Sequence, residues 1–168
     1  MPNELPKRKP TRLKNHDYST VGAYFVTICV QDRKTILSDI IMTVGEGLAP
    51  PEYKIVLSSY GEIVEKELLK ITERYECVTV EEYVIMPDHI HAIVILHRRA
   101  GGASPSPTIS DIICTFKSLT TRICKQNFGE IKMFQRGYYD HIIRDREDYE
   151  TRRRYIYENP IKWYYEHL

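Results

Sequence analysis

The sequence predicts an α+β fold, in which helices pack on one face of an antiparallel sheet. Runs of β-branched and aromatic residues, which favour strands, alternate along the chain with segments whose apolar residues recur at helical spacing. Two strand patterns, 77–85 and 89–96, are separated only by a short turn containing Pro87, which predicts a tight antiparallel hairpin. With 168 residues, the chain is the size of one domain with a sizeable core.

The elements are expected in a fixed order along the chain. They are a strand at 24–30, a short strand at 53–57, a helix at 59–75, strands at 77–85 and 89–96, a helix at 109–128, a short strand at 138–143 and a helix at 145–159. The first strand is apolar at nearly every position, which is typical of a strand buried on both faces.

Local signals set the ends of these elements. Ser59 and Glu62 have the spacing of a capping box, so the first helix is expected to begin there. The last helix is expected to end at Asn159, because a residue that precedes proline is disfavoured in the helical region. The stretch 31–51 is expected to be an irregular loop.

The order strand, helix, strand, strand, helix, strand is the split β-α-β arrangement of a ferredoxin-like sandwich, with the last helix appended at its C-terminal end. The expected domain organisation is a basic N-terminal arm at 1–20 followed by a single domain at 21–168. Many unrelated functions use this fold, so the function has to be inferred from particular side chains.

The net charge of the chain is +1, so the overall charge does not indicate nucleic-acid binding. Local clusters of basic residues do. Basic residues gather near the N-terminus and around the last helix: Lys7, Arg8, Lys9, Arg12 and Lys14, and then Arg144, Arg146, Arg152, Arg153 and Arg154. Such stretches can follow a phosphate backbone, or they can form a solvated tail and a solvated helix face.

The cysteines predict a reducing compartment. None of the four belongs to a C-x-x-C pair, and each lies in an apolar pattern typical of a buried free thiol. No apolar run approaches the roughly 18 residues that a membrane span requires, and the basic N-terminus lacks the hydrophobic segment of a signal peptide. We therefore expect a cytoplasmic protein with no membrane partner.

The sharpest local feature is His89-Ile90-His91 in the strand at 89–96. Side chains two residues apart on a strand point to the same face, so the two imidazoles are suited to bind one divalent metal. The alternative is a pair of half-buried histidines without a metal. Asp88 directly precedes the pair and is a candidate to orient a ligand or to lie just outside the ligand set.

Tyr155 and Asn159 are four residues apart on the last helix, so they share one face. If this helix lies over the histidine strand, a phenol and an amide oxygen reach the metal site together. The alternatives are a helix C-cap for Asn159 and core packing for Tyr155. Arg152 is a candidate to add positive charge near the phenol, or is a solvated helix arginine.

Several motifs together resemble one known family. They are Met-Pro-Asp-His-Ile-His at 86–91, Phe-Gln-Arg at 134–136, Tyr-Asp-His-Ile-Ile-Arg at 139–144 and Tyr-Ile-Tyr-Glu-Asn-Pro at 155–160. In this order, over about 24–162, the chain resembles the REP-associated tyrosine transposases of the HUH (His-hydrophobic-His) class, which use a single catalytic tyrosine.

The resemblance implies a ferredoxin-like fold, metal ligation by His89, His91 and Asn159, and Tyr155 as the nucleophile. Tyr157 faces away from Asn159 by helical geometry. The expected cofactor is Mg²⁺ or Mn²⁺, because hard cations with open positions suit phosphate chemistry. The motif at 139–144, which contains His141, also matches the family. The sequence suggests no physical role for His141 other than contact with DNA.

The function implied is a metal-assisted transposase or nickase acting on single-stranded DNA hairpins from palindromic elements. Attack by the phenol leaves a 5′-phosphotyrosine and a free 3′-hydroxyl, so strands can be rejoined without ATP. The DNA-contacting residues are expected to be Lys7, Arg8, Lys9, Arg12, Lys14, Arg144 and Arg152, in a monomer or homodimer.

Two other functions remain open from the sequence. One is a hairpin-DNA-binding protein that has lost cleavage, and the other is a ferredoxin-like RNA-processing nuclease that uses histidines as acid and base. A Tyr155→Phe variant separates the first from the enzyme, and sensitivity to chelation separates the second.

Overall fold

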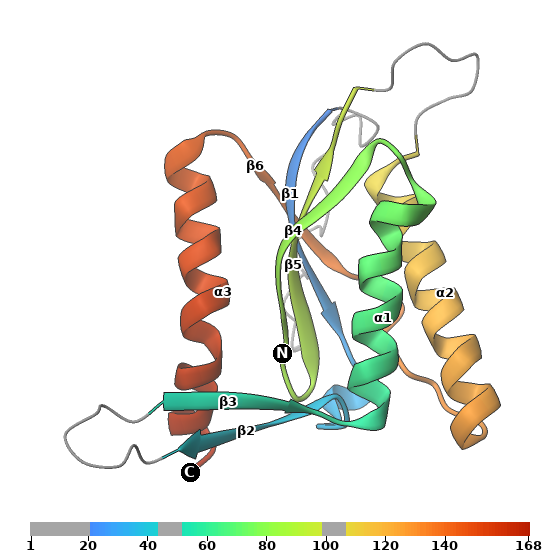
Figure 1. Cartoon of the computed structure of the whole chain (residues 1–168), viewed down its shortest axis with the longest axis vertical. Coiled ribbons are helices and arrows are strands. Elements are labelled where there is room, and N and C mark those ends of the chain that lie inside the picture. The colour runs from blue at the N-terminus through green and yellow to red at the C-terminus, as the bar shows by residue number, and fades with distance from the viewer. Residues whose placement is uncertain (1–20, 44–51, 99–106) are drawn as a thin grey trace, which may run out of the picture.

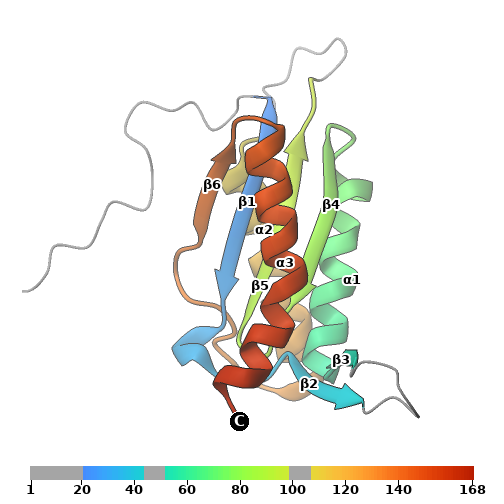
Figure 2. The same ribbon diagram turned by 90° about the vertical axis from the view of Figure 1, so that its left-hand side faces the viewer.

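The structure, a computed structural model, describes residues 21–43, 52–98 and 107–168. Its main sheet is antiparallel, with the strand order β4-β5-β1-β6. These strands are β1 (Gly22–Cys29), β4 (Val78–Ile85), β5 (His89–Leu96) and β6 (Tyr139–Ile143). Helices α1 (Ser59–Arg74) and α2 (Ile109–Phe128) cover one face, and α3 (Arg146–Glu166) lies on the other (Figures 1 and 2). The predicted ferredoxin-like α+β sandwich with an appended C-terminal helix is confirmed.

The sheet has an apolar core on each face. Tyr24, Val26 and Ile28 of β1 belong to the larger core beneath α1 and α2. Phe25, between them in sequence, belongs to a smaller core that includes Ile156 of α3. Because successive strand residues point to opposite faces, a strand covered on both sides needs an almost continuous apolar run.

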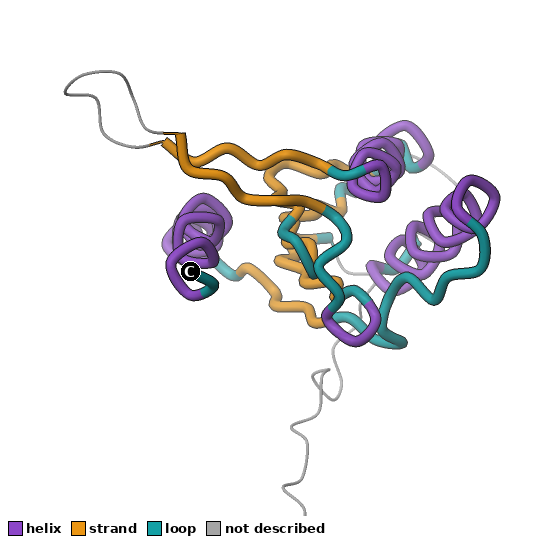
Figure 3. Tube along the Cα trace, turned by 90° about the horizontal axis from the view of Figure 1, so that it is seen from below, coloured by secondary structure: helices purple, strands orange, loops and turns teal. Residues whose placement is uncertain are grey.

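A second, two-stranded sheet replaces much of the loop expected at 31–51. Strand β2 (Ser38–Thr43) pairs antiparallel with β3 (Glu52–Leu57). The hairpin crosses the end of the main sheet and reaches toward α3 (Figures 1 and 3). The loop prediction was wrong for 38–43, because this short strand is defined by its pairing with β3 rather than by a strong pattern of its own. The arm at 1–20 and the glycines and prolines at 44–51 lie outside the described residues.

Helix α1 begins one residue before the expected capping box. The N-cap is Ser58, whose Oγ accepts a hydrogen bond from the Gly61 backbone N–H. Ser58 also donates its backbone N–H to the carbonyl of Leu37 at 2.9 Å, so the start of the helix rests on the segment before β2. Gly61 permits this approach, because a Cβ there would lie 2.0 Å from the Leu37 carbonyl oxygen.

Helix α3 does not end at Asn159 as predicted; it continues through Pro160 to Glu166. A proline inside a helix removes the N–H that would bond to the carbonyl four residues earlier, and its ring crowds that carbonyl, at a cost of about 3 kcal/mol that packing can offset. Pro160 is buried, and Trp163 packs against the core formed by Phe25 and Ile156. Tertiary burial therefore overrides the local stop signal.

Few side chains of α3 are buried, so apolar packing alone does not define its position. Polar contacts to the neighbouring strands supply the rest. Tyr149 donates to Glu81 of β4 at 2.7 Å, and Arg153 pairs with Glu82 at 2.8 Å. From β3, the Tyr53 hydroxyl donates to the backbone carbonyl of Tyr157 at 2.9 Å. These contacts set the position of the helix along the sheet, and hence of the side chains on its inner face.

Two expectations from composition concern described residues. None of the described helices combines the length and the apolar character needed to cross a membrane. All four cysteines are free thiols; Cys29, Cys77 and Cys124 are buried as expected, whereas Cys114 is exposed on α2.

Candidate metal and nucleophile site

His89 and His91 lie on the face of β5 that is covered by α3, and both are buried, with 6% and 4% of their surface exposed. Their Nε2 atoms face each other at 3.0 Å. As predicted from the strand geometry, the two imidazoles stand side by side on one face. Because the two Nε2 atoms are this close, one cation can contact both of them.

Each ring is oriented by a contact at its other nitrogen. The Nδ1 of His89 is hydrogen-bonded to Asp88 Oδ1, and the Nδ1 of His91 is 2.8 Å from Thr27 Oγ1. Thr27 lies directly opposite His91 in the β1–β5 register. Because a carboxylate can only accept, His89 donates from Nδ1 and keeps the lone pair of Nε2 for a ligand. Thr27 can impose the same state on His91 by accepting its Nδ1 proton.

Burial favours the neutral form of His91. Desolvation, together with the neighbouring His89 and Arg33, lowers the pKa of His91 to about 3. His91 is therefore uncharged at neutral pH, which is the state in which an imidazole binds a metal.

Arg33, in the turn after β1, supplies the positive charge that balances Asp88. The Nε of Arg33 lies 2.7 Å from Asp88 Oδ2, and its Nη1 donates to Cys29 Sγ at 3.1 Å. Asp32 and Arg33 both have positive φ, 57° and 54°, a conformation uncommon for residues other than glycine. The strained turn directs the guanidinium back over the end of β1, so that Arg33, Asp88 and His89 form one chain of contacts.

Tyr155 and Asn159 project from α3 onto this site. The Tyr155 ring centroid is 5.1 Å from that of His91, and the rings meet edge to face. Tyr155 remains 43% exposed, whereas Asn159 is 8% exposed, and its amide takes no hydrogen bond from another described side chain. Both residues line, with the two histidines, a pocket of about 650 Å³. The helix thus brings a phenol and an amide to the paired imidazoles, as the sequence predicted.

The donor set can hold a divalent metal ion. No three His, Cys, Asp or Glu side chains of the described residues converge on a point that could hold a metal. The candidate ligands are the ones that the resemblance implies: His89, His91 and the amide oxygen of Asn159, two nitrogens and one oxygen. Three protein ligands leave positions open for substrate oxygens and water, as a Mg²⁺ or Mn²⁺ site for phosphate chemistry requires.

The other predicted contact residues that the structure describes do not line this pocket. Arg152 pairs with Asp148 at 3.2 Å, and its guanidinium lies over the Phe25 ring, 5.7 Å from the centroid, rather than among the residues that line the pocket. His141 is bonded to the same carboxylate at 2.7 Å. Arg144 is exposed just before α3 and is also absent from the lining of the pocket. Lys7, Arg8, Lys9, Arg12 and Lys14 lie outside the described residues.

Sequence reasoning missed several residues of the pocket, notably Thr27, Arg33 and Trp163. Thr27 is a polar residue in an apolar strand, a signal that indicates a special position but not its partner. The Trp163 ring lies 5.9 Å from that of His89, and it reaches the site only because α3 continues past Pro160. Nothing in the local sequence pattern indicates Arg33.

A ferredoxin-like sheet with a His-Ile-His pair beneath a helix that carries a tyrosine and an asparagine is the arrangement of a single-tyrosine transposase. The chain belongs to the IS200-like transposases, whose family model matches residues 51–159.

Two proteins of Haemophilus influenzae are similar to this chain. An uncharacterized protein of Haemophilus influenzae is 30% identical over 171 residues, which cover 93% of this chain and 89% of that protein. A second H. influenzae protein, provisionally described as a REP-associated tyrosine transposase, is 29% identical over 153 residues, 87% of this chain and 74% of its own length.

Solved structures show the same fold. A REP-associated tyrosine transposase bound to a REP hairpin matches with a TM-score of 0.61 and 20% identity, over 90% of this chain and 74% of that one. A protein of Deinococcus radiodurans, provisionally described as a transposase, matches with a TM-score of 0.51 and 15% identity, over 89% of this chain and 98% of that one.

Proposed function

We propose that this chain cleaves and rejoins single-stranded DNA at palindromic, REP-like hairpins through a covalent 5′-phosphotyrosine on Tyr155. The observation that carries the proposal is the 5.1 Å approach of the Tyr155 ring to His91, whose Nε2 faces that of His89. A half-exposed phenol beside two adjacent imidazoles is the combination that metal-assisted phosphoryl transfer to tyrosine requires.

Each side chain of the site has a distinct role. His89, His91 and Asn159 would hold Mg²⁺ or Mn²⁺, which would supply positive charge to offset that of the scissile phosphate. Asp88 and Thr27 orient the two imidazoles through their Nδ1 atoms. Helix α3 carries Tyr155, and the packing of its ring against His91 fixes where the phenol enters the site.

The proposed reaction is an exchange of two ester bonds. The Tyr155 oxygen forms a bond to phosphorus and loses its proton to solvent, the bond from phosphorus to the 3′ oxygen breaks, and that oxygen takes up a proton. One phosphodiester replaces another, so the reverse attack by a 3′-hydroxyl reseals the strand and releases the tyrosine without ATP. The accessibility of Tyr155, together with the open side of the pocket, gives room for such a strand.

The DNA class is inferred from similarity. A structural neighbour is a REP-associated transposase bound to a REP hairpin, and a relative in H. influenzae carries the same type of description. We extend the hairpin substrate to this chain, with the basic residues at 7–14, Arg144 and Arg152 as candidate contacts to phosphates.

The test is a covalent adduct. The protein is incubated with Mn²⁺ and 5′- and 3′-labelled oligonucleotides that carry the palindromes of its own genome, and label migrating with denatured protein is measured. The wild type and a Tyr157→Phe control, altered on the same helix at a 64% exposed position, should form the adduct. Tyr155→Phe should bind the DNA and form none.

Other results contradict the proposal in recognisable ways. Hairpin binding without any adduct from the wild type indicates a binding protein that has lost cleavage. Cleavage that leaves no protein on the DNA and survives EDTA indicates a nuclease that uses its histidines as acid and base. In such a nuclease the lowered pKa of His91 would suit this residue to the role of base and not of acid near pH 7.

A further inference from the structure

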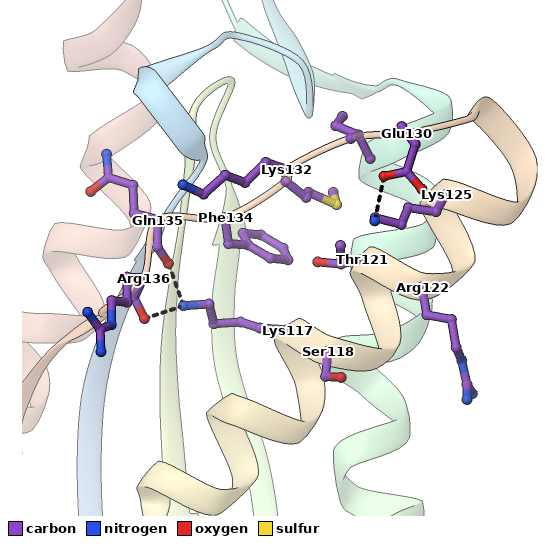
Figure 4. Close-up of a pocket in the computed structure, with 12 residues that line it drawn as sticks. Lys117, Ser118, Thr121, Arg122, Lys125, Glu130, Lys132, Phe134, Gln135 and Arg136 are labelled. Carbon is purple, nitrogen blue, oxygen red and sulfur yellow. Dashed lines mark hydrogen bonds and ion pairs between the residues drawn. The ribbon is translucent and has the colours of Figure 1, made fainter.

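Away from the tyrosine site, α2 and residues 130–136 frame a groove of about 720 Å³ (Figure 4). We call it the α2 groove; it is built on the helix layer that covers the opposite face of the sheet from α3 (Figure 1). Its lining includes five basic side chains and one acidic one: Lys117, Arg122, Lys125, Lys132 and Arg136, and Glu130. In a chain with a net charge of +1, this is a marked local concentration of positive charge.

Two of the five cations are used within the protein. Lys125 pairs with Glu130 at 2.6 Å. Lys117 reaches across the groove and donates to the backbone carbonyls of Gln135, at 2.6 Å, and of Gly137, at 3.0 Å, and so holds the opposite wall in place (Figure 4 shows its contact with residue 135). A half-buried ammonium that satisfies backbone carbonyls is a structural clamp, and not a free ligand-binding group.

The other three cations are available. Arg122, Lys132 and Arg136 are exposed, and none forms an ion pair with another described side chain. The hydroxyls of Ser118 and Thr121 lie among them on α2. Unpaired guanidinium and ammonium groups beside neutral hydroxyl donors form a surface that suits successive phosphates of a nucleic-acid backbone.

The wall of the α2 groove is continuous with the tyrosine site. The backbone of Gln31 donates to the Met133 carbonyl at 2.8 Å, and that of Gln135 donates to the Cys29 carbonyl at 3.0 Å. Cys29 lines the tyrosine pocket, and so does Tyr139, three residues after Arg136 and therefore within about 11 Å of it along the chain. One DNA molecule can contact both regions by crossing this short backbone bridge.

We propose that the α2 groove binds the phosphodiester backbone of the DNA substrate, away from the phosphate that is cleaved, through Arg122, Lys132 and Arg136. This rests on the proposed function, since it takes DNA as the substrate. The backbone comes from the paired stem of the hairpin or from the unpaired strand beside it, and both present the same phosphodiester chemistry.

The test compares two triple variants with equal loss of charge. The groove variant is Arg122→Gln, Lys132→Gln and Arg136→Gln, and the control is Lys54→Gln, Lys66→Gln and Arg98→Gln, at exposed positions that do not line the groove. Binding is measured by fluorescence anisotropy between 50 and 300 mM salt. The probes are a blunt DNA hairpin, its single-stranded flank alone, and the two joined.

The groove variant should bind the joined probe about tenfold or more weakly than the control variant, with a salt slope smaller by about 2 to 3, the change expected for three lost phosphate contacts. A loss seen with the blunt hairpin assigns the groove to the stem, and a loss seen with the flank assigns it to the single strand. Equal affinities and equal slopes for the two variants overturn the proposal.

The adduct assay separates this proposal from the proposed function. At saturating DNA, the groove variant should form as much phosphotyrosine as the wild type, because its substitutions lie outside the tyrosine pocket. If the wild type forms no adduct, the proposed cleavage fails, whereas the binding comparison still decides whether the α2 groove contacts DNA.

Discussion

Replacing Thr27 by valine should weaken metal binding while leaving every proposed ligand in place. Thr27 Oγ1 lies 2.8 Å from His91 Nδ1, and His91 is 4% exposed, so water cannot readily replace the lost hydroxyl. Valine has nearly the same shape, so the change removes the hydrogen bond without opening a cavity. Loss of such a contact behind a ligating histidine typically weakens metal affinity about 10- to 100-fold, which corresponds to about 1.4–2.8 kcal/mol.

The single tryptophan provides the assay. Trp163 lies 5.9 Å from the His89 ring, so paramagnetic Mn²⁺ bound beside His89 should quench its fluorescence. Titration of metal-free protein then gives the Mn²⁺ dissociation constant without any DNA. Thr27→Ser keeps the hydroxyl and should bind Mn²⁺ nearly as tightly as the wild type.

Two results would refute this reasoning. If Thr27→Val binds Mn²⁺ within twofold of the wild type, the hydroxyl does not orient His91. If Thr27→Ser is as weak as Thr27→Val, the methyl group and not the hydroxyl is what matters, and the contact acts through packing.

Two further predictions concern stability. Gly61→Ala should lower the free energy of unfolding by about 1–3 kcal/mol, because the new Cβ would meet the Leu37 carbonyl oxygen at 2.0 Å. Gly137→Ala is the control, because its new Cβ meets nothing within 4 Å. Equal denaturation midpoints for the two variants would contradict the argument. Although burial acts to raise the pKa of Asp148, hydrogen bonds from His141, the Arg144 backbone and Arg152 lower it overall. The ionised carboxylate therefore stabilises the fold above about pH 4 and loses this effect as the pH falls through its lowered pKa. Denaturation at several pH values should show Asp148→Asn less stable than the wild type at pH 7, with the gap closing in acid; a gap independent of pH would exclude the carboxylate as its source.

Features that depend on local chain geometry could be predicted from the order of the residues. The alternation of a strand places His89 and His91 on one face, and the helical repeat places Tyr155 and Asn159 on another. The tight turn after Ile85 and the order of apolar segments were enough to predict the ferredoxin-like sheet. These periods are fixed by the backbone, so the side chains that share a face can be identified before any tertiary contact is known.

The tertiary structure decided which faces meet and what supports them. Thr27 orients His91 only because the β1–β5 register sets them opposite each other, and Arg33 reaches Asp88 only through a turn with positive φ. Helix α3 continues past Pro160 because burial outweighs a local stop signal, and this continuation brings Trp163 to the site. Register, turn strain and helix docking are settled by burial and hydrogen bonding between residues far apart in sequence, which no local pattern encodes.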